Sequence, residues 1–456
     1  MQKAREVESA VNIRRLGHLD LPGGGQVTVV GDYAYVGHLY PPLGTSIIDI
    51  SDPRKPRLVS QVMLPDTYTH SHKVRVVGDL MFTNHEQEQR YYYRKGEMLA
   101  VYAEAARKQL GREPTDAELA AFMSGNINDN GKLLTLTEKD VKRLREAGKR
   151  GYHEGGFRIW DISNKAEPKL IKHQNTFGWG VHRFDLDSKY IYTSTEWEGY
   201  LGNIVVIYDI SDPTKPHYVS HWGIPGQHIA GGEQPHWVED NWRVHHALRQ
   251  GNELWVSGLW AGFFGVDISD IHNPKTIAHH NYHPPFPEPT HTVLPMPFEV
   301  GGRRVAVVAD ETQIHRRGQP HGMMWLFDIT DLSQIKPLSV FTVSPLHTPW
   351  ARPDSWFGCH QFQEHFEDTS VCAAWFAGGV RIIDIKDPTQ PVETGYFVPE
   401  PSGGATSVGT NDVDVDGRGL IYTIDRYNGF DILERTGHTP IPEDGDDGHG
   451  HGCGCE

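Results

Sequence analysis

Residues 47–56 read IIDISDPRKP, and variants of this phrase recur at intervals of tens of residues along the chain. In each variant an apolar stretch runs into Asp-Ile, and in the complete copies a Pro follows a few residues later. Self-similarity at such a period is typical of repeat architectures, so this phrase decides the fold class. The other copies read RIWDISNKAEP (158–168), VIYDISDPTKP (206–216), GVDISDIHNP (265–274), LFDITDLSQIKP (326–337), RIIDIKDPTQP (381–391) and a truncated GFDIL (429–433).

Each repeat contains short apolar segments separated by turn residues. Around the first copy these segments are 26–30, 33–38, 46–51 and 56–64, with Gly-Asp and Asp-Pro pairs between them. The Asp carboxylate can accept backbone N–H groups and Pro fixes φ in the turn, so we interpret the phrase itself as structural. Four strands per repeat and seven copies predict an all-β fold, a seven-bladed β-propeller over residues 12–434.

The two ends of the chain predict how such a ring closes. The last repeat supplies three apolar segments, 411–416, 420–425 and 430–433, and the chain then turns polar. Residues 12–22 read NIRRLGHLDLP and match the pattern of a fourth strand. We therefore expect the N-terminal strand to complete the last blade, which leaves no long free edge.

One long insertion interrupts the second blade. Residues 86–153 contain helix signals at 113–123 and 137–150, and the second of these opens with a Thr-x-x-Asp pattern. A helical insertion in a propeller acts either as a lid over a site or as an element of an interface, and both readings stay open.

The cysteines and the C-terminal tail carry a separate signal. Four cysteines in the whole chain are too few for a disulfide framework. Residues 435–456 have almost no apolar content and are expected to be disordered. The tail contains imidazole and thiol groups of the kind that bind soft metals, which suggests that it helps to load a metal. These residues are His449, His451, Cys453 and Cys455.

The composition limits the partners and the compartment. The chain has 456 residues and a formal net charge of -16, which argues against a nucleic-acid binder because such proteins need a clustered basic face. There is no signal-peptide pattern and no run of about 18 apolar residues, so we expect a cytoplasmic protein that does not contact a membrane. A small-molecule ligand is compatible with these limits, and so is a homo-oligomer.

Five of the 27 histidines fall at one position when the first strands of the repeats are aligned. In a propeller these strands line the central channel. In the three repeats without an insertion, the second strand is taken to begin eight residues after the aligned histidine. These strands begin at positions 80, 190 and 254. The remaining two repeats carry Gly25 and Asn411 at this position. The aligned histidines are His72, His182, His246, His291 and His360.

Histidines that converge on one axis either bind water individually or share a cation. Neutral imidazole is the commonest metal ligand, so five of them in one register favour a metal site. Either four histidines hold the ion and the fifth acts beside it, or three hold it and leave open positions. Copper or iron fits best, and zinc remains a candidate. Carboxylates near the ends of second strands are candidates to orient the rings or to transfer protons: Glu196, Asp310 and Glu311.

The repeated phrase resembles the LVIVD-repeat β-propeller family, and the resemblance covers nearly all of residues 12–434 outside the insertion. The histidine set is similar to those of two metal-bearing seven-bladed families. One is the carotenoid-cleavage oxygenases, in which four histidines hold iron. The other is the selenium-binding protein and methanethiol oxidase group, which is associated with copper and which STEWEG (194–199) also resembles.

These resemblances imply a metal-dependent oxidoreductase that acts on a small organic substrate. Two alternatives stay open at this point. The same ion could serve as the Lewis acid of a lyase or hydrolase. The chain could also be a non-catalytic scaffold or metal-binding propeller.

Overall fold

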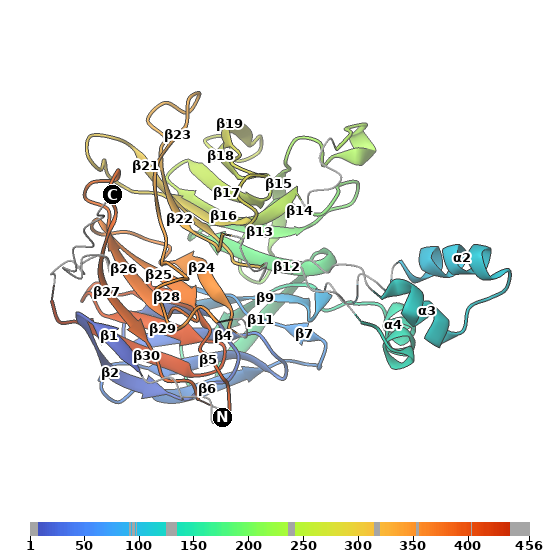
Figure 1. The fold of residues 1–456 in the computed structure, drawn as a ribbon, viewed down its shortest axis with the longest axis horizontal. Helices are drawn as coiled ribbons and strands as arrows, with labels where there is room; N and C mark the ends of the chain where they lie inside the picture. Colours follow the sequence, from blue (N-terminus) through green and yellow to red (C-terminus); the bar gives the residue numbers. More distant parts are fainter. Residues whose placement is uncertain are drawn as a thin grey trace, which may run out of the picture.

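The computed structural model describes residues 8–90, 93, 96, 98–124, 135–235, 242–313, 320–352, 355–402 and 404–437. Over this range the protein is nearly all-β, with antiparallel strands in curled, barrel-like sheets and a few helices on one side (Figure 1). The tail with its histidines and cysteines lies outside the described residues from position 438 onward.

The strands pair with their neighbours in chain order, in sets. The first set is β3 (Gly24–Val30), β4 (Tyr33–His38), β5 (Leu43–Asp49) and β6 (Arg57–Met63). The second is β7 (Thr69–His70), β8 (Val74–Val77), β9 (Leu80–Gln87), β10 (Gly156–Asp161) and β11 (Lys169–Asn175). The third is β12 (Phe177–Leu186), β13 (Tyr190–Glu196), β14 (Asn203–Asp209) and β15 (His217–Trp222).

The second half of the chain continues in the same manner. The next set is β16 (Trp242–Gln250), β17 (Glu253–Leu259), β18 (Phe263–Asp267) and β19 (Lys275–His280). It is followed by β20 (Thr290–Pro295), β21 (Val305–Asp310), β22 (Met324–Asp328) and β23 (Lys336–Phe341). The last two are β24 (Phe357–Phe362), β25 (Ser370–Phe376), β26 (Val380–Asp384) and β27 (Val392–Val398), then β28 (Thr410–Val415), β29 (Ile421–Asp425) and β30 (Gly429–Arg435).

The N-terminal segment supplies the outer strand of the last set. Strand β2 (Ile13–Leu19) pairs antiparallel with β30, from Ile13 opposite Arg435 to Leu19 opposite Phe430. Strand β1 (Ser9–Val11) pairs with β27. The two ends of the chain are therefore joined by backbone hydrogen bonds, which is the arrangement expected for residues 12–22.

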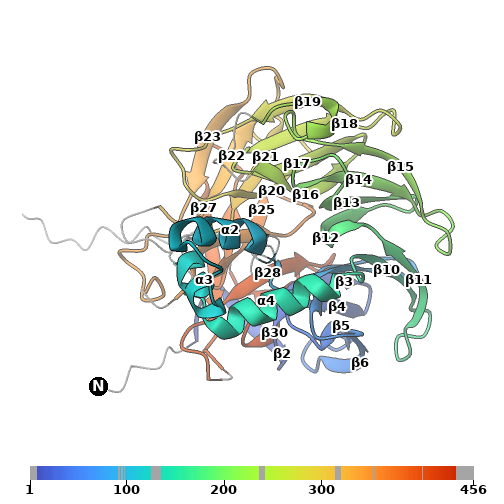
Figure 2. The same ribbon diagram turned by 90° about the vertical axis from the view of Figure 1, so that its right-hand side faces the viewer.

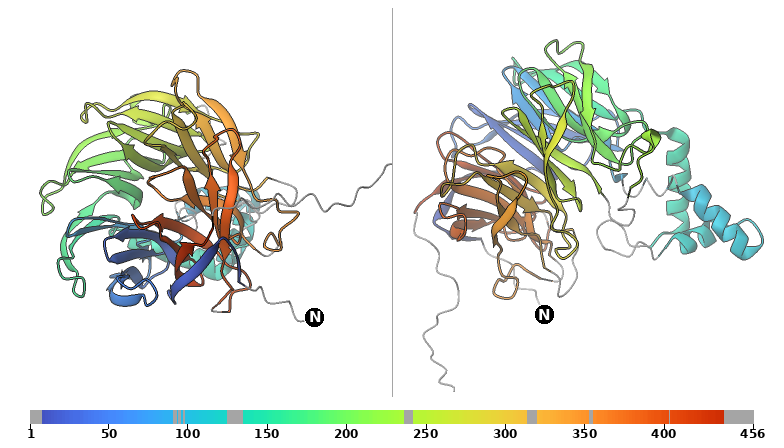
Figure 3. Two further views of the ribbon diagram at one scale, coloured as in Figure 1. Left: turned by 90° about the vertical axis from the view of Figure 1, so that its left-hand side faces the viewer. Right: turned by 90° about the horizontal axis from the view of Figure 1, so that it is seen from above.

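The innermost strands follow one another around the centre of the molecule (Figure 3). Strand β3 contacts β8, β12 contacts β16, and the contacts continue through β20, β24 and β28 back to β3. Strands β9 and β12 are paired through Glu86 and Gly180. Apolar side chains fill the space between adjacent sets, and one cluster joins Val36 and Ile48 to Tyr422. Residues near both ends of the chain thus share one core.

The repeated phrase forms the turn between the third and fourth strands of a set. Asp49 accepts hydrogen bonds from the backbone N–H and the hydroxyl of Ser51, at 3.0 and 2.6 Å. Asp52 accepts the backbone N–H of Arg54 at 3.0 Å. The carboxylates therefore satisfy backbone donors inside the turn, in agreement with a structural role.

The insertion forms a helical arm between β9 and β10 that stands off from the strands (Figures 1 and 2). The helices for which the structure gives bounds are α2 (Leu99–Leu110), α3 (Asp116–Met123) and α4 (Glu138–Arg150). Thr115 and Thr137 form capping boxes at the starts of α3 and α4. No helix in the described part of the chain is long and apolar enough to span a membrane.

Candidate metal centre

Histidines lie at bulges in four of the innermost strands, whereas His72 lies between β7 and β8. The cross-strand register shifts around His182 in β12, around His291 in β20 and around Asn411 in β28. Wider shifts in β16 and β24 contain His245 and His360. A bulge adds a residue that has no cross-strand partner and re-aims its side chain. In this protein the re-aimed side chains line one cavity.

That cavity has a volume of about 180 Å³, and five imidazole rings follow one another around it. The centroids of neighbouring rings are 4.2 to 5.3 Å apart. Leu39, Leu259 and Trp356 add apolar surface to the wall. The order of the rings is His72, His182, His245, His291 and His360.

The set of strands β16–β19 contributes His245 to this ring, whereas the sequence alignment chose His246. His246 is regularly paired with Ser257, and its Nδ1 lies 3.4 Å from Oε1 of Glu364 in the next layer of side chains. The alignment was displaced by one residue because it took the second strand to begin at its first apolar residue, position 254. Strand β17 begins at Glu253, and the eight-residue spacing then leads to His245.

Three of the rings are held through Nδ1. Nδ1 of His245 lies 2.9 Å from the carbonyl oxygen of His291, and Nδ1 of His360 contacts a carbonyl oxygen of β28. Nδ1 of His182 lies 2.8 Å from a carboxylate oxygen of Glu86. Donation from Nδ1 fixes the tautomer that leaves the Nε2 lone pair for a metal.

His291 is held differently. Its Nδ1 lies 2.8 Å from the hydroxyl of Thr292, and Nη1 of Arg183 lies 3.1 Å from its Nε2. A metal ion at His291 would therefore have to displace the hydrogen bond from Arg183.

Two carboxylates approach the rings, and each completes a group of two histidines and one glutamate. In the first group, ligand atoms of His245, His291 and Glu311 lie within 4.8 Å of one another. Nε2 of His360 is 3.8 Å from Oε1 of Glu311, and Nε2 of Gln313 donates to the other oxygen at 2.7 Å. Sequence reasoning named Glu311 as a site residue, although to orient the rings or to transfer protons and not as a metal ligand.

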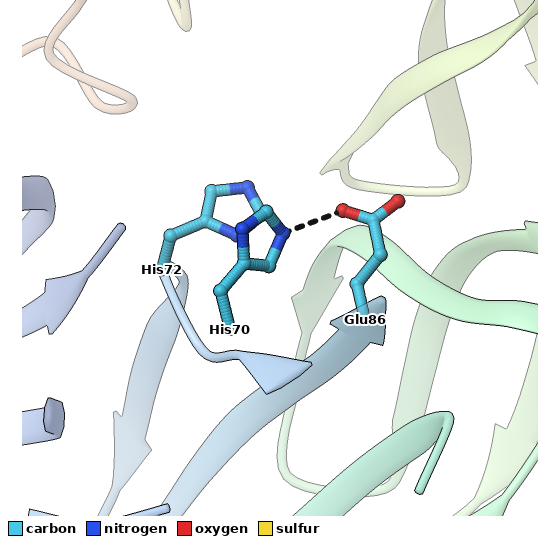
Figure 4. Close-up of side chains that lie close together, drawn as sticks. All are labelled: His70, His72 and Glu86. Atoms are coloured by element: carbon cyan, nitrogen blue, oxygen red, sulfur yellow. Dashed lines mark hydrogen bonds and ion pairs between the residues drawn. The ribbon is translucent and has the colours of Figure 1, made fainter. Parts of the chain in front are cut away.

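The second group consists of His70, His72 and Glu86, whose ligand atoms also lie within 4.8 Å of one another (Figure 4). Sequence reasoning did not find His70 or Glu86. The His70-x-His72 spacing was a usable signal, because alternate residues of an extended segment share a face.

The other two predicted carboxylates lie elsewhere. Glu196 accepts the backbone N–H of Trp179 at 2.9 Å. Asp310 accepts hydrogen bonds from the hydroxyl of Tyr282 at 2.6 Å and from the indole of Trp325 at 2.8 Å. Burial raises the pKa of Asp310 to about 7. The structure thus gives both residues structural partners away from the ring.

Burial sets the charge of the histidines. It lowers the pKa of His182 to about 3, although Glu86 opposes the shift. Burial, with neighbouring histidines and cations, holds the pKa of His72, His245, His291 and His360 well below the ordinary value. Neutral imidazole is the form that binds metal, so the cavity presents ligands that need not lose a proton at neutral pH.

Cationic side chains line the same cavity. Arg243 and Arg426 are among its lining residues, together with Lys73. Nε of Arg426 donates to Oδ1 of Asn411 at 2.7 Å, and its guanidinium lies 4.4 Å from the ring centroid of Trp356. A protein of strongly negative net charge thus presents fixed guanidinium groups in this cavity.

Comparison with known proteins identifies the repeat. The LVIVD repeat matches residues 24–64, 151–176, 189–222 and 371–398. No curated protein matches the chain significantly. Among solved structures, the chain is similar to the crystal structure of the computationally designed Ika8 protein, with 7% identity, a TM-score of 0.47, and coverage of 92% of this chain and 98% of that one. The protein is therefore a strand-rich protein that contains LVIVD repeats.

Proposed function

We propose that this protein is a seven-bladed LVIVD-repeat β-propeller enzyme, a metal-dependent oxidoreductase of the oxygenase or oxidase type that acts on a small organic substrate. The fold proposal is supported by the antiparallel sets and by the contacts that bring β28 back to β3. The functional proposal depends on one observation. Ligand atoms of His245, His291 and Glu311 lie within 4.8 Å of one another beside the cavity.

The donor set favours iron among the candidate metals. Two histidines and one carboxylate with open positions are the ligands of non-haem iron(II) oxygenases, whereas copper sites more often lack the carboxylate. A bound iron(II) ion would supply redox chemistry with O₂. The protein would hold it through His245, His291 and Glu311, with His360 beside Glu311.

The surrounding residues orient these ligands. The carbonyl oxygen of His291 holds the ring of His245, and the amide of Gln313 holds one oxygen of Glu311. Outer contacts of this kind keep metal ligands in a productive orientation, and their loss typically costs about 10- to 100-fold in metal affinity or activity.

The cavity also indicates the class of substrate. Its volume of about 180 Å³ admits only a small molecule. Arg243 and Arg426 would attract an anionic group, and Leu39 and Leu259 offer apolar surface in the same cavity. We therefore favour a small organic acid, with its carboxylate directed toward Arg426.

Metal analysis of purified protein, followed by O₂ uptake with a panel of small aliphatic and aromatic carboxylates, tests the proposal. We expect stoichiometric iron in the wild type and loss of metal and O₂ uptake in Glu311→Gln. The matched control is Glu167→Gln, an exposed carboxylate in a turn, which should behave as the wild type. Absence of stoichiometric metal would refute the metal site, and metal without O₂ uptake would favour Lewis-acid chemistry instead.

A further inference from the structure

A second group of ligand-type side chains adjoins the cavity, outside the ligand set of the proposed oxidoreductase. His70 and His72 come from the segment between β6 and β9, and both line the cavity. Glu86 comes from the end of β9 and is almost completely buried. Figure 4 shows the two imidazole rings side by side, with the Glu86 carboxylate directed toward His70.

We propose that His70, His72 and Glu86 bind a second divalent transition-metal ion, so that the cavity holds a two-metal centre. This inference rests on the proposed function, because it adds a second ion to the same centre. The donor set is again two histidines and one carboxylate, which suits iron(II), manganese(II) or cobalt(II).

The separation of the donor atoms fits a shared ion. Nε2 of His70 lies 2.9 Å from Oε2 of Glu86. Two ligands that each lie about 2.1 Å from a metal at a right angle are about 3.0 Å apart. The two atoms therefore already have the spacing of neighbouring metal ligands. Metal binding would replace the proton between them.

The carboxylate is held in position by groups outside the proposed ligand set. Arg90 forms an ion pair with Oε1 of Glu86, and Nδ1 of His182 lies 2.8 Å from Oε2. The ring of His182 lies between the two groups, 5.3 Å from the ring of His72 and 4.9 Å from that of His245. His182 thus connects the two proposed sites through direct contacts.

A purely structural role would predict different behaviour. In that reading Glu86 neutralises Arg90 at the start of the helical arm, and His70 satisfies the remaining carboxylate oxygen. The stability of the protein would then depend on Glu86, but the metal stoichiometry would not change when His70 is replaced. Metal stoichiometry therefore separates the two readings.

The test is anaerobic titration of chelator-treated full-length protein with cobalt(II), followed by equilibrium dialysis and metal analysis. We expect His70→Gln and Glu86→Gln each to bind one equivalent less than the wild type. His245→Gln should also lose one equivalent, because it removes a ligand of the first site. His272→Gln, which replaces an exposed histidine in a turn, is the matched control and should bind as the wild type. Any metal bound by the C-terminal tail is the same in the wild type and in the variants, so it does not affect the difference in bound equivalents between them.

The electron paramagnetic resonance spectrum gives a second readout. The two ligand groups share no residue, so the cobalt(II) signal at full occupancy should contain the contributions of two ions. His70→Gln should show the signal of one ion. If His70→Gln and the wild type bind the same amount of metal, the second site is refuted while the first stands. If His245→Gln also binds as much metal as the wild type, both proposals fail. Circular dichroism of the metal-free variants verifies that they fold.

Discussion

Nη2 of Arg183 lies 3.0 Å from Oε1 of Glu364, and this buried ion pair lies directly beneath the histidine ring. Arg183 follows His182 in the chain and also contacts His291. Glu364 lines a second cavity of about 230 Å³. The pair therefore lies between the two cavities and links side chains from distant strands.

Replacing Arg183 with Met should destabilise the protein substantially. The side chain is 1% exposed, and its loss removes one partner of Glu364 and a hydrogen bond to Gln361. Arg75 remains paired with Glu364, so we expect a loss of about 3 kcal/mol, near the lower end for a broken buried pair. Urea denaturation with the metal-free protein measures this loss.

Arg418→Met is the control for that measurement. Arg418 pairs with Asp416 at 2.7 Å, but its side chain is 45% exposed. Exposed pairs contribute about 1 kcal/mol or less. Equal denaturation midpoints for the two variants would contradict a structural role for the pair between Arg183 and Glu364.

Adjacent histidines of β16 should differ sharply in metal binding. His245→Gln removes a proposed ligand, whereas His246→Gln alters a residue that lies 3.4 Å from Glu364 below the ring. We expect His245→Gln to lower the bound metal and His246→Gln to leave it unchanged. Metal analysis with thermal melts as a check on folding decides the matter, and the opposite pattern would support the original alignment.

The repeated phrase made the strand order predictable from sequence. Asp49 and its equivalents mark turns whose carboxylates bond to nearby backbone N–H groups, so each copy locates the strands on either side. The helix over 99–110 was not predicted, because its N-cap residue, Met98, provides no side-chain cap. Of the two predicted helices, only the one over 137–150 was recognised by its cap, Thr137, although Thr115 forms an equivalent cap at the start of α3.

The site could be predicted only in part, because bulges break the alternation on which alignment depends. His72 and His182 were found because their second strands, β9 and β13, begin with an apolar residue eight positions later. His245 was displaced by one position because Glu253, a polar residue, begins its second strand. Glu86 could not be found by repeat alignment, since Glu86 lies in β9 and the next strand, β10, follows only after the long insertion.

Arg426 should determine the affinity for an anionic substrate. Its guanidinium is fixed by Asn411 and by the ring of Trp356, and it lines the cavity without belonging to either ligand group. We expect Arg426→Gln to raise KM by about 10-fold or more, as for the loss of one charged hydrogen bond, with a smaller effect on kcat. Steady-state O₂ uptake measures both constants. An unchanged KM would contradict the assignment of an organic acid as substrate.

The stability of the metal-free protein should fall as the pH drops below 6.5. The pKa values of the cavity histidines are lowered in the folded state, so between pH 6.5 and those values the unfolded chain binds more protons. Each such histidine costs up to about 1.4 kcal/mol of stability per pH unit in this range. Urea denaturation at pH 7, 6 and 5 should therefore show progressively lower midpoints.

Buried acidic groups oppose this trend, because burial raises the pKa of five aspartates, which are Asp185, Asp310, Asp412, Asp414 and Asp425. The pKa values of Asp310, Asp412 and Asp425 are raised to about 7, 6 and 6, so these groups favour folding as the pH falls toward 4. The histidines with lowered pKa still outnumber the acids with raised pKa, because His38, His85 and His246 also belong to that group, and the net slope should retain the sign of the histidines. His245→Gln removes one of these histidines. The unfolding free energy of the variant should therefore depend less steeply on pH, by about 1.4 kcal/mol per pH unit. A midpoint that rises on acidification would show that the buried acidic groups dominate and would contradict this prediction.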